Sequence, residues 1–206
     1  KAAEVASPVQ KETIEALISF YNTGDLKEYD RFNILWVQDT ASMVDFVNGF
    51  TEVYGDPLGY KASWEAMVNF KDMDATRRTE IISANAQWFE DHSPIQEKYR
   101  KKEVKGVSAK VINAAILGGD CYPGINLPNA NWIRSHHGSK SVTIQNITQA
   151  YAESSKGNGF IEEFIFRPED RERITLYGTI GDNMHTDLHE CLGHGSGQLA
   201  PGVKGD

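Results

Sequence analysis

Two histidines and a glutamate in the C-terminal part of the sequence are the residues best suited to chemistry. They form the run His189-Glu190-Cys191-Leu192-Gly193-His194. Neutral imidazoles are common zinc ligands, and a carboxylate beside them can take a proton from water on the metal. This combination is the side-chain set of a zinc hydrolase helix.

The spacing of the two histidines differs from the common His-Glu-x-x-His arrangement. On a helix of about 3.6 residues per turn, residues four apart lie about 40° from alignment and residues five apart about 140°. A regular α-helix would therefore point His189 and His194 to different faces. An i→i+5 bulge brings such residues onto one face, and Gly193 lies where a widened turn is least hindered. The sequence therefore predicts a π-type turn at the motif.

Other interpretations of this stretch stay open. His185 and His189 are four residues apart on the same predicted helix and form a rival pair, although Thr186 rather than a glutamate follows His185. Cys191 lies on the apolar stripe of the helix, which favours a packed thiol over a nucleophile. A structural zinc site usually closes with four side chains, and the cysteines are not placed to complete one.

Composition indicates an ordinary globular protein. The chain has 206 residues, of which 40% are hydrophobic and 24% charged, enough to bury one core or two small ones. A formal charge of -8 without a long basic run argues against nucleic acid or an anionic membrane as a partner. No apolar stretch approaches the roughly 20 residues of a membrane span, and no signal peptide is visible. Two cysteines make no disulfide framework, which fits a reducing compartment, so we expect a cytoplasmic location; a secreted protein is the alternative.

Capping residues, apolar spacing and turn signals predict the elements that must position the motif. In chain order we expect helices over 8–23 and 25–37, strands over 43–54 and 60–70, a helix over 74–91, a strand over 107–117, a loop over 118–129, a helix over 141–153, and a final helix after a break around 178–182. The buried stripe of the final helix would be Met184, Leu188, Cys191 and Leu192.

The order of helices, then strands, then helices predicts an α+β fold. We divide it into a helical segment over 1–40, a β-rich substrate-binding core with an inserted helix over 41–130, and a helical segment with the zinc motif over 131–206.

Three blocks of the sequence resemble the dipeptidyl peptidase III family of zinc exopeptidases. They are GFTEVYGDPLG at 49–59, GINLPN at 124–129 and HECLGHGSGQL at 189–199, in the order that the family has them. The last block is similar to the form found in bacterial members. The resemblance covers about residues 45–206, and it implies a fragment of a two-lobed enzyme that releases dipeptides from the N-terminus of short peptides.

The resemblance also implies a catalytic role for each matching residue of the motif. His189 and His194 would bind Zn²⁺, and Glu190 would activate the attacking water. Tyr54 would donate a hydrogen bond to the oxyanion that forms at the second peptide bond.

The other two blocks would bind the substrate. The resemblance implies that Glu52, Asn126 and Asn129 hold the protonated amino terminus of the peptide. The residues agree for Glu52, because an ammonium group in a cleft needs a carboxylate partner and few other charges lie nearby in this segment. The family's strand near Gly124 would pair with the extended peptide backbone.

A third zinc ligand is missing from the sequence. Catalytic zinc takes three protein ligands and one open position. The family supplies the third from a Glu-Glu-x-Arg-Ala-Glu motif, and no such run occurs here. We therefore expect the third ligand beyond residue 206, together with the remaining lobe, and expect this stretch alone to be inactive. The alternative is a non-catalytic peptide-binding module with an incomplete metal site.

Overall fold

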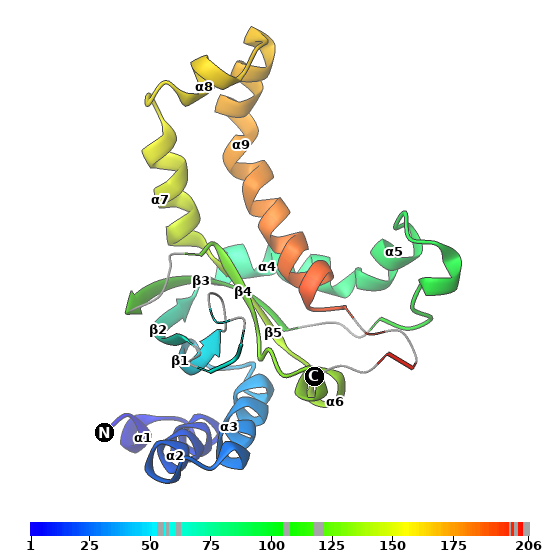
Figure 1. Cartoon of the computed structure of the whole chain (residues 1–206). Coiled ribbons are helices and arrows are strands. Elements are labelled where there is room, and N and C mark those ends of the chain that lie inside the picture. The colour runs from blue at the N-terminus through cyan, green and yellow to red at the C-terminus, as the bar shows by residue number, and fades with distance from the viewer. Residues whose placement is uncertain are drawn as a thin grey trace.

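A five-stranded sheet lies at the centre of the described residues (Figure 1). The computed structural model describes residues 1–52, 56, 58–60, 63–104, 108–117, 122–197, 199 and 202–203. The strand order is β1-β2-β3-β5-β4, with bounds β1 Val44–Glu52, β2 Ser63–Lys71, β3 Ser108–Leu117, β4 Gly124–Leu127 and β5 Lys140–Ile144. β3 and β5 pair in parallel, and the other neighbours are antiparallel. The mixed helix-and-sheet architecture confirms the α+β prediction.

Helices surround the sheet on both sides. They are α1 Ala2–Val5, α2 Pro8–Thr23, α3 Leu26–Gln38, α4 Met73–Ala84, α5 Ala86–Asp91, η1 Glu97–Tyr99, α6 Asn131–His137, α7 Gln145–Ser155, α8 Phe160–Phe164, α9 Pro168–Leu188 and the π-helical turn η2 His189–His194. In Figure 1, α1 to α3 lie below the sheet, while α7 to α9 project above it. None of the helices in the described ranges is long and apolar enough to cross a membrane.

Capping explains why the two N-terminal helices lie where the sequence predicts them. The Ser7 side chain accepts from the backbone N–H of Gln10 at the start of α2, and Gly24 ends that helix with a φ of 71°. The Asp25 carboxylate accepts from the backbone N–H of Lys27 at 2.9 Å and begins α3. Both predictions are confirmed.

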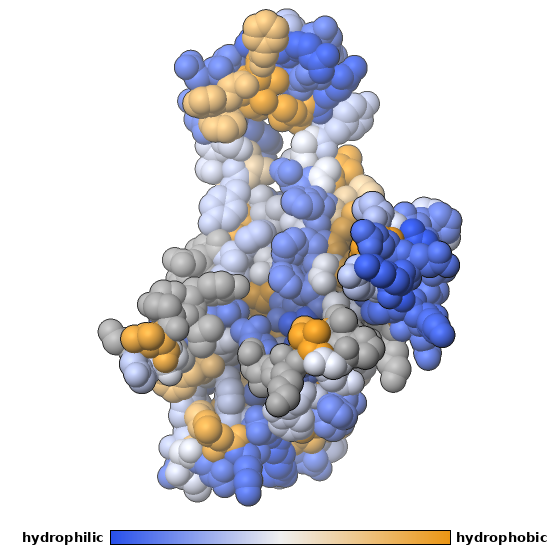
Figure 2. Space-filling model, turned by 45° about the vertical axis from the view of Figure 1, so that its right-hand side comes forward, coloured by the Kyte–Doolittle hydropathy of each residue, from blue (hydrophilic) through white to orange (hydrophobic). Residues whose placement is uncertain are grey.

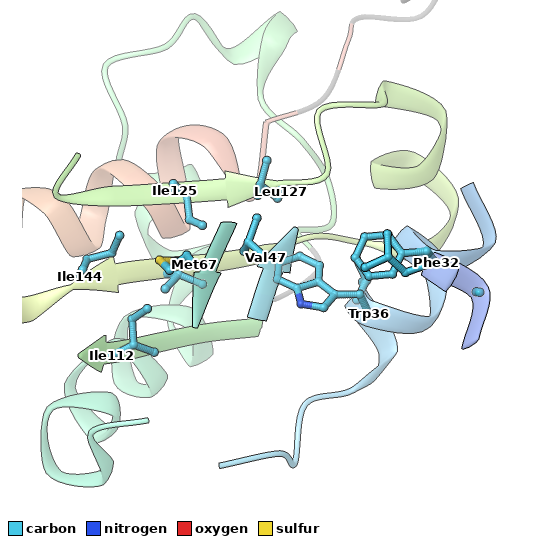
Figure 3. Close-up of a cluster of buried hydrophobic side chains, with 12 residues drawn as sticks. Phe32, Trp36, Val47, Met67, Ile112, Ile125, Leu127 and Ile144 are labelled. Carbon is cyan, nitrogen blue, oxygen red and sulfur yellow. The ribbon is translucent and has the colours of Figure 1, made fainter. Parts of the chain in front are cut away.

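The main core lies between α2, α3 and one face of the sheet (Figure 3). Figure 3 shows Phe32 and Trp36 at one end of the apolar layer and Ile112 and Ile144 at the other. Every strand contributes, and the buried set is Ala16, Leu17, Phe32, Trp36, Val37, Val47, Met67, Ile112, Ile125, Leu127, Val142 and Ile144. We call this side of the sheet the apolar face.

A buried ion cluster lies at the edge of the main core. The Oδ2 atom of Asp45 is 3.0 Å from Nζ of Lys140 and 3.3 Å from Nζ of Lys110. Trp36 donates from Nε1 to the other Asp45 oxygen at 3.1 Å, and Nζ of Lys140 lies 4.3 Å from the centre of the indole ring. Burial lowers the pKa of Lys140 to about 8, although Asp45 opposes the shift.

α4, α9 and η2 contact the opposite face of the sheet. A smaller core of Ile82, Ala109 and Cys191 lies there, with Leu188 and Leu192 packed beside it. The Cys191 thiol is 2% exposed, and burial raises its pKa to about 12, as a packed thiol requires.

The projection formed by α7, α8 and α9 exposes apolar side chains. Phe164 and Phe166 are 67% and 93% exposed near its tip. Figure 2 shows hydrophobic surface at the top of the molecule, over this tip. Met184 on α9 is 47% exposed, so it does not belong to the buried stripe predicted for that helix.

Several predicted elements are corrected. The helix predicted over 141–153 begins only at Gln145, because residues 140–144 form β5. Part of the predicted loop 118–129 is β4, and the predicted helix 74–91 is two helices that meet at Asn85. The break predicted around 178–182 is absent, since α9 runs through it. The segment 131–206 thus contributes β5 to the same sheet as 41–130, and the three-part division stays a prediction.

Candidate active site

The two motif histidines lie on the π-helical turn η2, which continues α9. The backbone N–H of Gly195 donates to the carbonyl of Glu190 at 2.9 Å, an i→i+5 bond. The turn brings Nε2 of His189 and Nε2 of His194 to 2.9 Å from each other. The π turn predicted from the spacing is confirmed. The rival His185 ring lies farther away, with its centre 6.3 Å from that of His189.

The two imidazoles fit a zinc ion in chemistry and nearly in distance. Two nitrogens about 2.0–2.1 Å from a tetrahedral ion lie about 3.3 Å apart, slightly more than the distance found here. Burial, followed by the nearby His189 and Arg134 charges, lowers the pKa of His194 and favours the neutral form that ligates metal. Within the described ranges, no group of three His, Cys, Asp or Glu side chains could hold a metal ion. The structure therefore brings two imidazole nitrogens close together, and their binding of zinc stays a prediction.

Glu190 lies against the first residue of β4. A Cβ atom added to Gly124 would lie 2.6 Å from Oε1 of Glu190, so the glycine leaves the space that this carboxylate occupies. Oε2 of Glu190 is buried and has no hydrogen-bond partner among the described residues. Burial raises the pKa of the Glu190 carboxyl to about 7. The Glu190 carboxylate therefore lies at the sheet edge, and one of its oxygens has no hydrogen-bond partner among the described residues.

Polar side chains on one face of β4 and β5 lie against the motif and the end of α9. Because side chains alternate along a strand, Asn126, Ser141 and Thr143 face away from the apolar face. We call these three residues the polar row. Thr143 donates to Asp187 at 2.7 Å, and Ser141 donates to the backbone carbonyl of Glu190 at 2.7 Å. Both contacts hold the junction of α9 and η2 on β5.

Asp187 connects the same junction to α4. Its side chain is fully buried, and its second oxygen accepts from Nε of Arg78 at 2.5 Å. A buried carboxylate needs such partners, since an unpaired charge in the interior is costly. The sequence did not single out Asp187, Arg78 or Thr143, because their partners are far apart in the chain.

A cavity of about 510 Å³ brings the predicted substrate-binding and zinc-motif residues together. Seven of the eight predicted site residues line it, namely Glu52, Gly124, Asn126, Asn129, His189, Glu190 and His194. The eighth, Tyr54, lies outside the described residues. The three sequence blocks therefore meet at one place.

Glu52 and Asn129 form a polar pair in this cavity. Nδ2 of Asn129 donates to Oε2 of Glu52 at 3.1 Å and to the carbonyl of Thr51 at 2.7 Å. The β1–β2 register shifts between Phe50 and Glu52, and such irregularities re-aim side chains at strand ends. Burial raises the pKa of Glu52, while the Asn129 hydrogen bond lowers it. A partly desolvated carboxylate in a cavity can receive a cation.

Three further cavity residues were missed by sequence reasoning. The Tyr122 hydroxyl donates to Glu65, which is 4% exposed. Arg134 on α6 donates to the carbonyl of His194 and thereby connects α6 to the end of η2. None of them lies in a recognisable local pattern, because their roles come from contacts between elements distant in sequence.

Known proteins resemble this chain over most of its length. The model of peptidase family M49 matches residues 1–204. The chain belongs to peptidase family M49. Dipeptidyl peptidase 3 of Rattus norvegicus is 27% identical over 199 residues, which are 96% of this chain and 26% of the rat protein. The chain therefore spans about a quarter of the length of the M49 relatives that it matches.

Two other similar proteins extend the M49 comparison. The structure of DPP III from Caldithrix abyssi superposes with a TM-score of 0.74 at 25% identity, covering 92% of this chain and 37% of that one. Nudix hydrolase 3 of Arabidopsis thaliana is 28% identical over 198 residues, which are 94% of this chain and 24% of that protein. The same stretch thus occurs in a protein named for other chemistry.

Proposed function

We propose that this chain supplies the substrate-binding sheet and the zinc-motif helix of a two-lobed, zinc-dependent peptidase that releases dipeptides from the N-terminus of short peptides. Membership of family M49 supports peptidase activity. The observation that carries the proposal is the shared cavity, in which the Glu52–Asn129 pair and the His189–His194 turn meet.

The peptide would bind along β4 with its amino end at Glu52. β4 is an edge strand of the described sheet, so its outer side can pair with an extended backbone. The Glu52 carboxylate would pair with the protonated amino group, while Asn129 fixes the orientation of that carboxylate. Anchoring the amino end at a fixed place lets an enzyme count residues from that end.

Glu190 would move the proton in the hydrolytic step. Zinc, when bound between His189 and His194, would supply a Lewis acid for the water and the scissile carbonyl. Glu190 would take the proton of the attacking water and pass it to the leaving nitrogen. Tyr54 would donate a hydrogen bond to the oxyanion.

Replacing Glu190 tests the proposed base directly. In the complete protein, Glu190→Ala should reduce dipeptide release by about 100- to 10,000-fold, because positioned general bases contribute factors of that size. Zinc content, measured by atomic emission, should stay as in the unaltered protein, whereas His194→Ala should lose zinc. Unchanged release by Glu190→Ala would contradict the assignment.

A matched pair of peptides tests the amino-end site. The unaltered protein should cleave a tetrapeptide with a free amino end and leave the N-acetylated peptide intact. Glu52→Gln should raise KM for the free peptide, because the charge that pairs with the ammonium group is removed. Equal cleavage of both peptides by the unaltered protein would remove the role of Glu52.

A second candidate function is a non-catalytic peptide-binding module. It is favoured for this stretch alone by the lack of a three-ligand group among the described residues. Zinc stoichiometry and dipeptide release, measured on these 206 residues and on a longer protein, separate the two candidates. We expect activity only in the longer protein, where a further lobe supplies the third ligand and contacts the exposed apolar side chains of α8. A cytoplasmic location stays a prediction.

A further inference from the structure

The polar row contains a hydrogen-bond chain whose direction can be worked out. Asn126 and Ser141 are directly opposite each other in the β4–β5 register, and both are buried. Nδ2 of Asn126 lies 2.7 Å from Oγ of Ser141, and that Oγ lies 2.7 Å from the carbonyl oxygen of Glu190. The chain therefore runs from a predicted substrate-binding amide to the backbone of the zinc motif.

The carbonyl of Glu190 sets the direction of every bond in this chain. A carbonyl oxygen only accepts, so the single hydroxyl hydrogen of Ser141 must point to it. Oγ of Ser141 then has only lone pairs left for Asn126, and it accepts from an amide N–H. Asn126 must therefore present its nitrogen to Ser141 and cannot present its oxygen there.

The second hydrogen of the Asn126 amide is also bonded inside the protein. Nδ2 of Asn126 donates it to Oγ of Ser139, and these two atoms are 3.2 Å apart. Oδ1 of Asn126 is buried and has no partner among the described residues, although the side chain lines the cavity and is only 8% exposed. A buried acceptor without a donor is costly, and a ligand that donates to this oxygen would remove that cost.

We propose that Ser141 is a positioning residue that keeps Oδ1 of Asn126 as the acceptor for the amino end of a bound peptide. The inference rests on the proposed function, in which Asn126 contacts that amino end. Ser141 itself touches no substrate. It acts by accepting from the Asn126 nitrogen, so that the Asn126 oxygen faces the ligand. The Ser141 hydroxyl is in turn oriented by the Glu190 carbonyl, which also accepts the hydrogen bond of the π turn.

Without the Ser141 hydroxyl, both orientations of the amide become available. The Asn126 nitrogen would lose its 2.7 Å acceptor, and the flipped amide would present N–H groups to a ligand ammonium group. Two donors facing each other repel, so the affinity for a free amino end should fall. A ligand without that ammonium group should be much less affected.

Binding to zinc-free protein measures this difference without turnover. The complete protein is treated with a chelator, and calorimetry gives Kd for a tetrapeptide with a free amino end and for its desamino analogue. Ser141→Ala should weaken binding of the free peptide about tenfold, as expected for one hydrogen bond to a charged group. The desamino analogue should change by less than about twofold.

A pair of equal-shaped variants separates the hydroxyl from packing. Ser141→Thr keeps the hydroxyl and Ser141→Val has the same shape without it, so any strain from the extra methyl is shared. The Thr variant should discriminate between the two peptides as the unaltered protein does, and the Val variant should not. This pair also decides the question where Ser141→Ala does not fold. Equal discrimination by the Thr and Val variants would overturn the proposal.

Two further variants complete the test. Ser135→Ala removes a similar serine-to-carbonyl hydrogen bond on the exposed surface of α6 and should leave both Kd values unchanged. In an Asn126→Ala background, Ser141→Ala should cause no further loss of discrimination, because the residue that it positions is gone. A full additional loss there would show that Ser141 acts independently of Asn126, and an equal loss for both peptides would show a general structural role. Either result would contradict the proposal.

The two proposals fail in different ways. An unaltered protein that releases no dipeptides contradicts the proposed function, whatever Ser141 does. Dipeptide release together with equal behaviour of the Thr and Val variants contradicts only the positioning role.

Discussion

The nine residues of β4 and β5 alternate between the two faces of the sheet, and the two faces contact different parts of the molecule. Ile125, Leu127, Val142 and Ile144 join the main core between the sheet and the helices α2 and α3. Asn126, Ser141 and Thr143 meet the zinc motif and its helix instead. One face therefore contributes mainly apolar burial, and the other contributes directed hydrogen bonds.

This difference predicts how substitutions divide between stability and activity. Apolar burial is roughly proportional to area and has no direction, so damage to the apolar face should lower stability and leave the site geometry in the folded molecules. Hydrogen bonds depend on direction, so damage to the polar side should lower activity at a smaller cost in stability. The following predictions test that division.

The largest stability effect is expected on the apolar face. Ile144 is fully buried, and Ile144→Ala should lower the free energy of unfolding by about 3 kcal/mol because it leaves a cavity in the core. Urea unfolding measures the loss. Dipeptide release per folded molecule should stay within about twofold of the unaltered protein. A loss of release without a loss of stability would contradict the proposed division between the two faces.

The largest activity effect outside the motif itself is expected at Gly124. A Cβ atom there would lie 2.6 Å from Oε1 of Glu190, and the flexible carboxylate must move away. Gly124→Ala should reduce kcat about 100-fold, as expected for a catalytic group displaced by about 1 Å. The melting temperature should change little, since only a side-chain end moves. A large loss of stability with normal kcat would reverse the roles of the two faces.

A moderate pH effect is expected from Lys140, which lies on the apolar side. Burial lowers its pKa to about 8, from 10.5 in the unfolded chain, so the unfolded state binds more protons between these values. Stability should therefore rise with pH in that window, by about 2 kcal/mol between pH 7.5 and 9.5 at about 1.4 kcal/mol per pKa unit. The charged groups that face Lys140 are Asp45, Lys110 and Asp39.

The control for this effect is Lys140→Met, which keeps Asp45 paired with Lys110. Urea unfolding across the same pH range should show that the Met variant lacks the rise. If stability rises equally with pH in both proteins, a group other than Lys140 causes the rise.

The smallest effect is expected on the projection, away from both faces. Lys156 and Glu153 form an ion pair at 2.5 Å, with side chains 66% and 70% exposed. Exposed pairs of this kind contribute little because water and salt screen them. Glu153→Gln should change neither unfolding nor dipeptide release measurably, and a clear loss of either would show that this surface is covered by another part of the protein.

Local signals predicted much of this structure. Ser7 and Gly24 determine the two ends of α2, and Asp25 determines the start of α3, through caps that involve only neighbouring residues. The π turn followed from the five-residue spacing of His189 and His194 together with the need to converge on a metal. In each case the physical cause lies within a few residues of the feature.

The sequence interpretation was wrong where a signal was short or depended on distant partners. β5 has five residues and continues without a glycine or proline into α7, so its alternation was absorbed into a predicted helix. Gly178 and Gly181 were expected to break α9, but the cost of a helical glycine is only about 1 kcal/mol, and tertiary contacts such as that of Asp187 exceed it. Ser141 could be recognised only once β4 and β5 were paired.

The π turn also determines where the chain goes after the motif. A π turn contains one extra residue. Each residue after His194 therefore lies at the angle around the helix axis that the preceding residue would have in a regular α-helix. Ser196 consequently turns inward and donates to the carbonyl of Leu192 at 2.7 Å, and Gly197 passes so close to Gly193 that a Cβ atom would lie 3.1 Å from its carbonyl oxygen. The extra residue between the two histidines thus determines where the backbone leaves the helix, while both imidazoles still point to the same place.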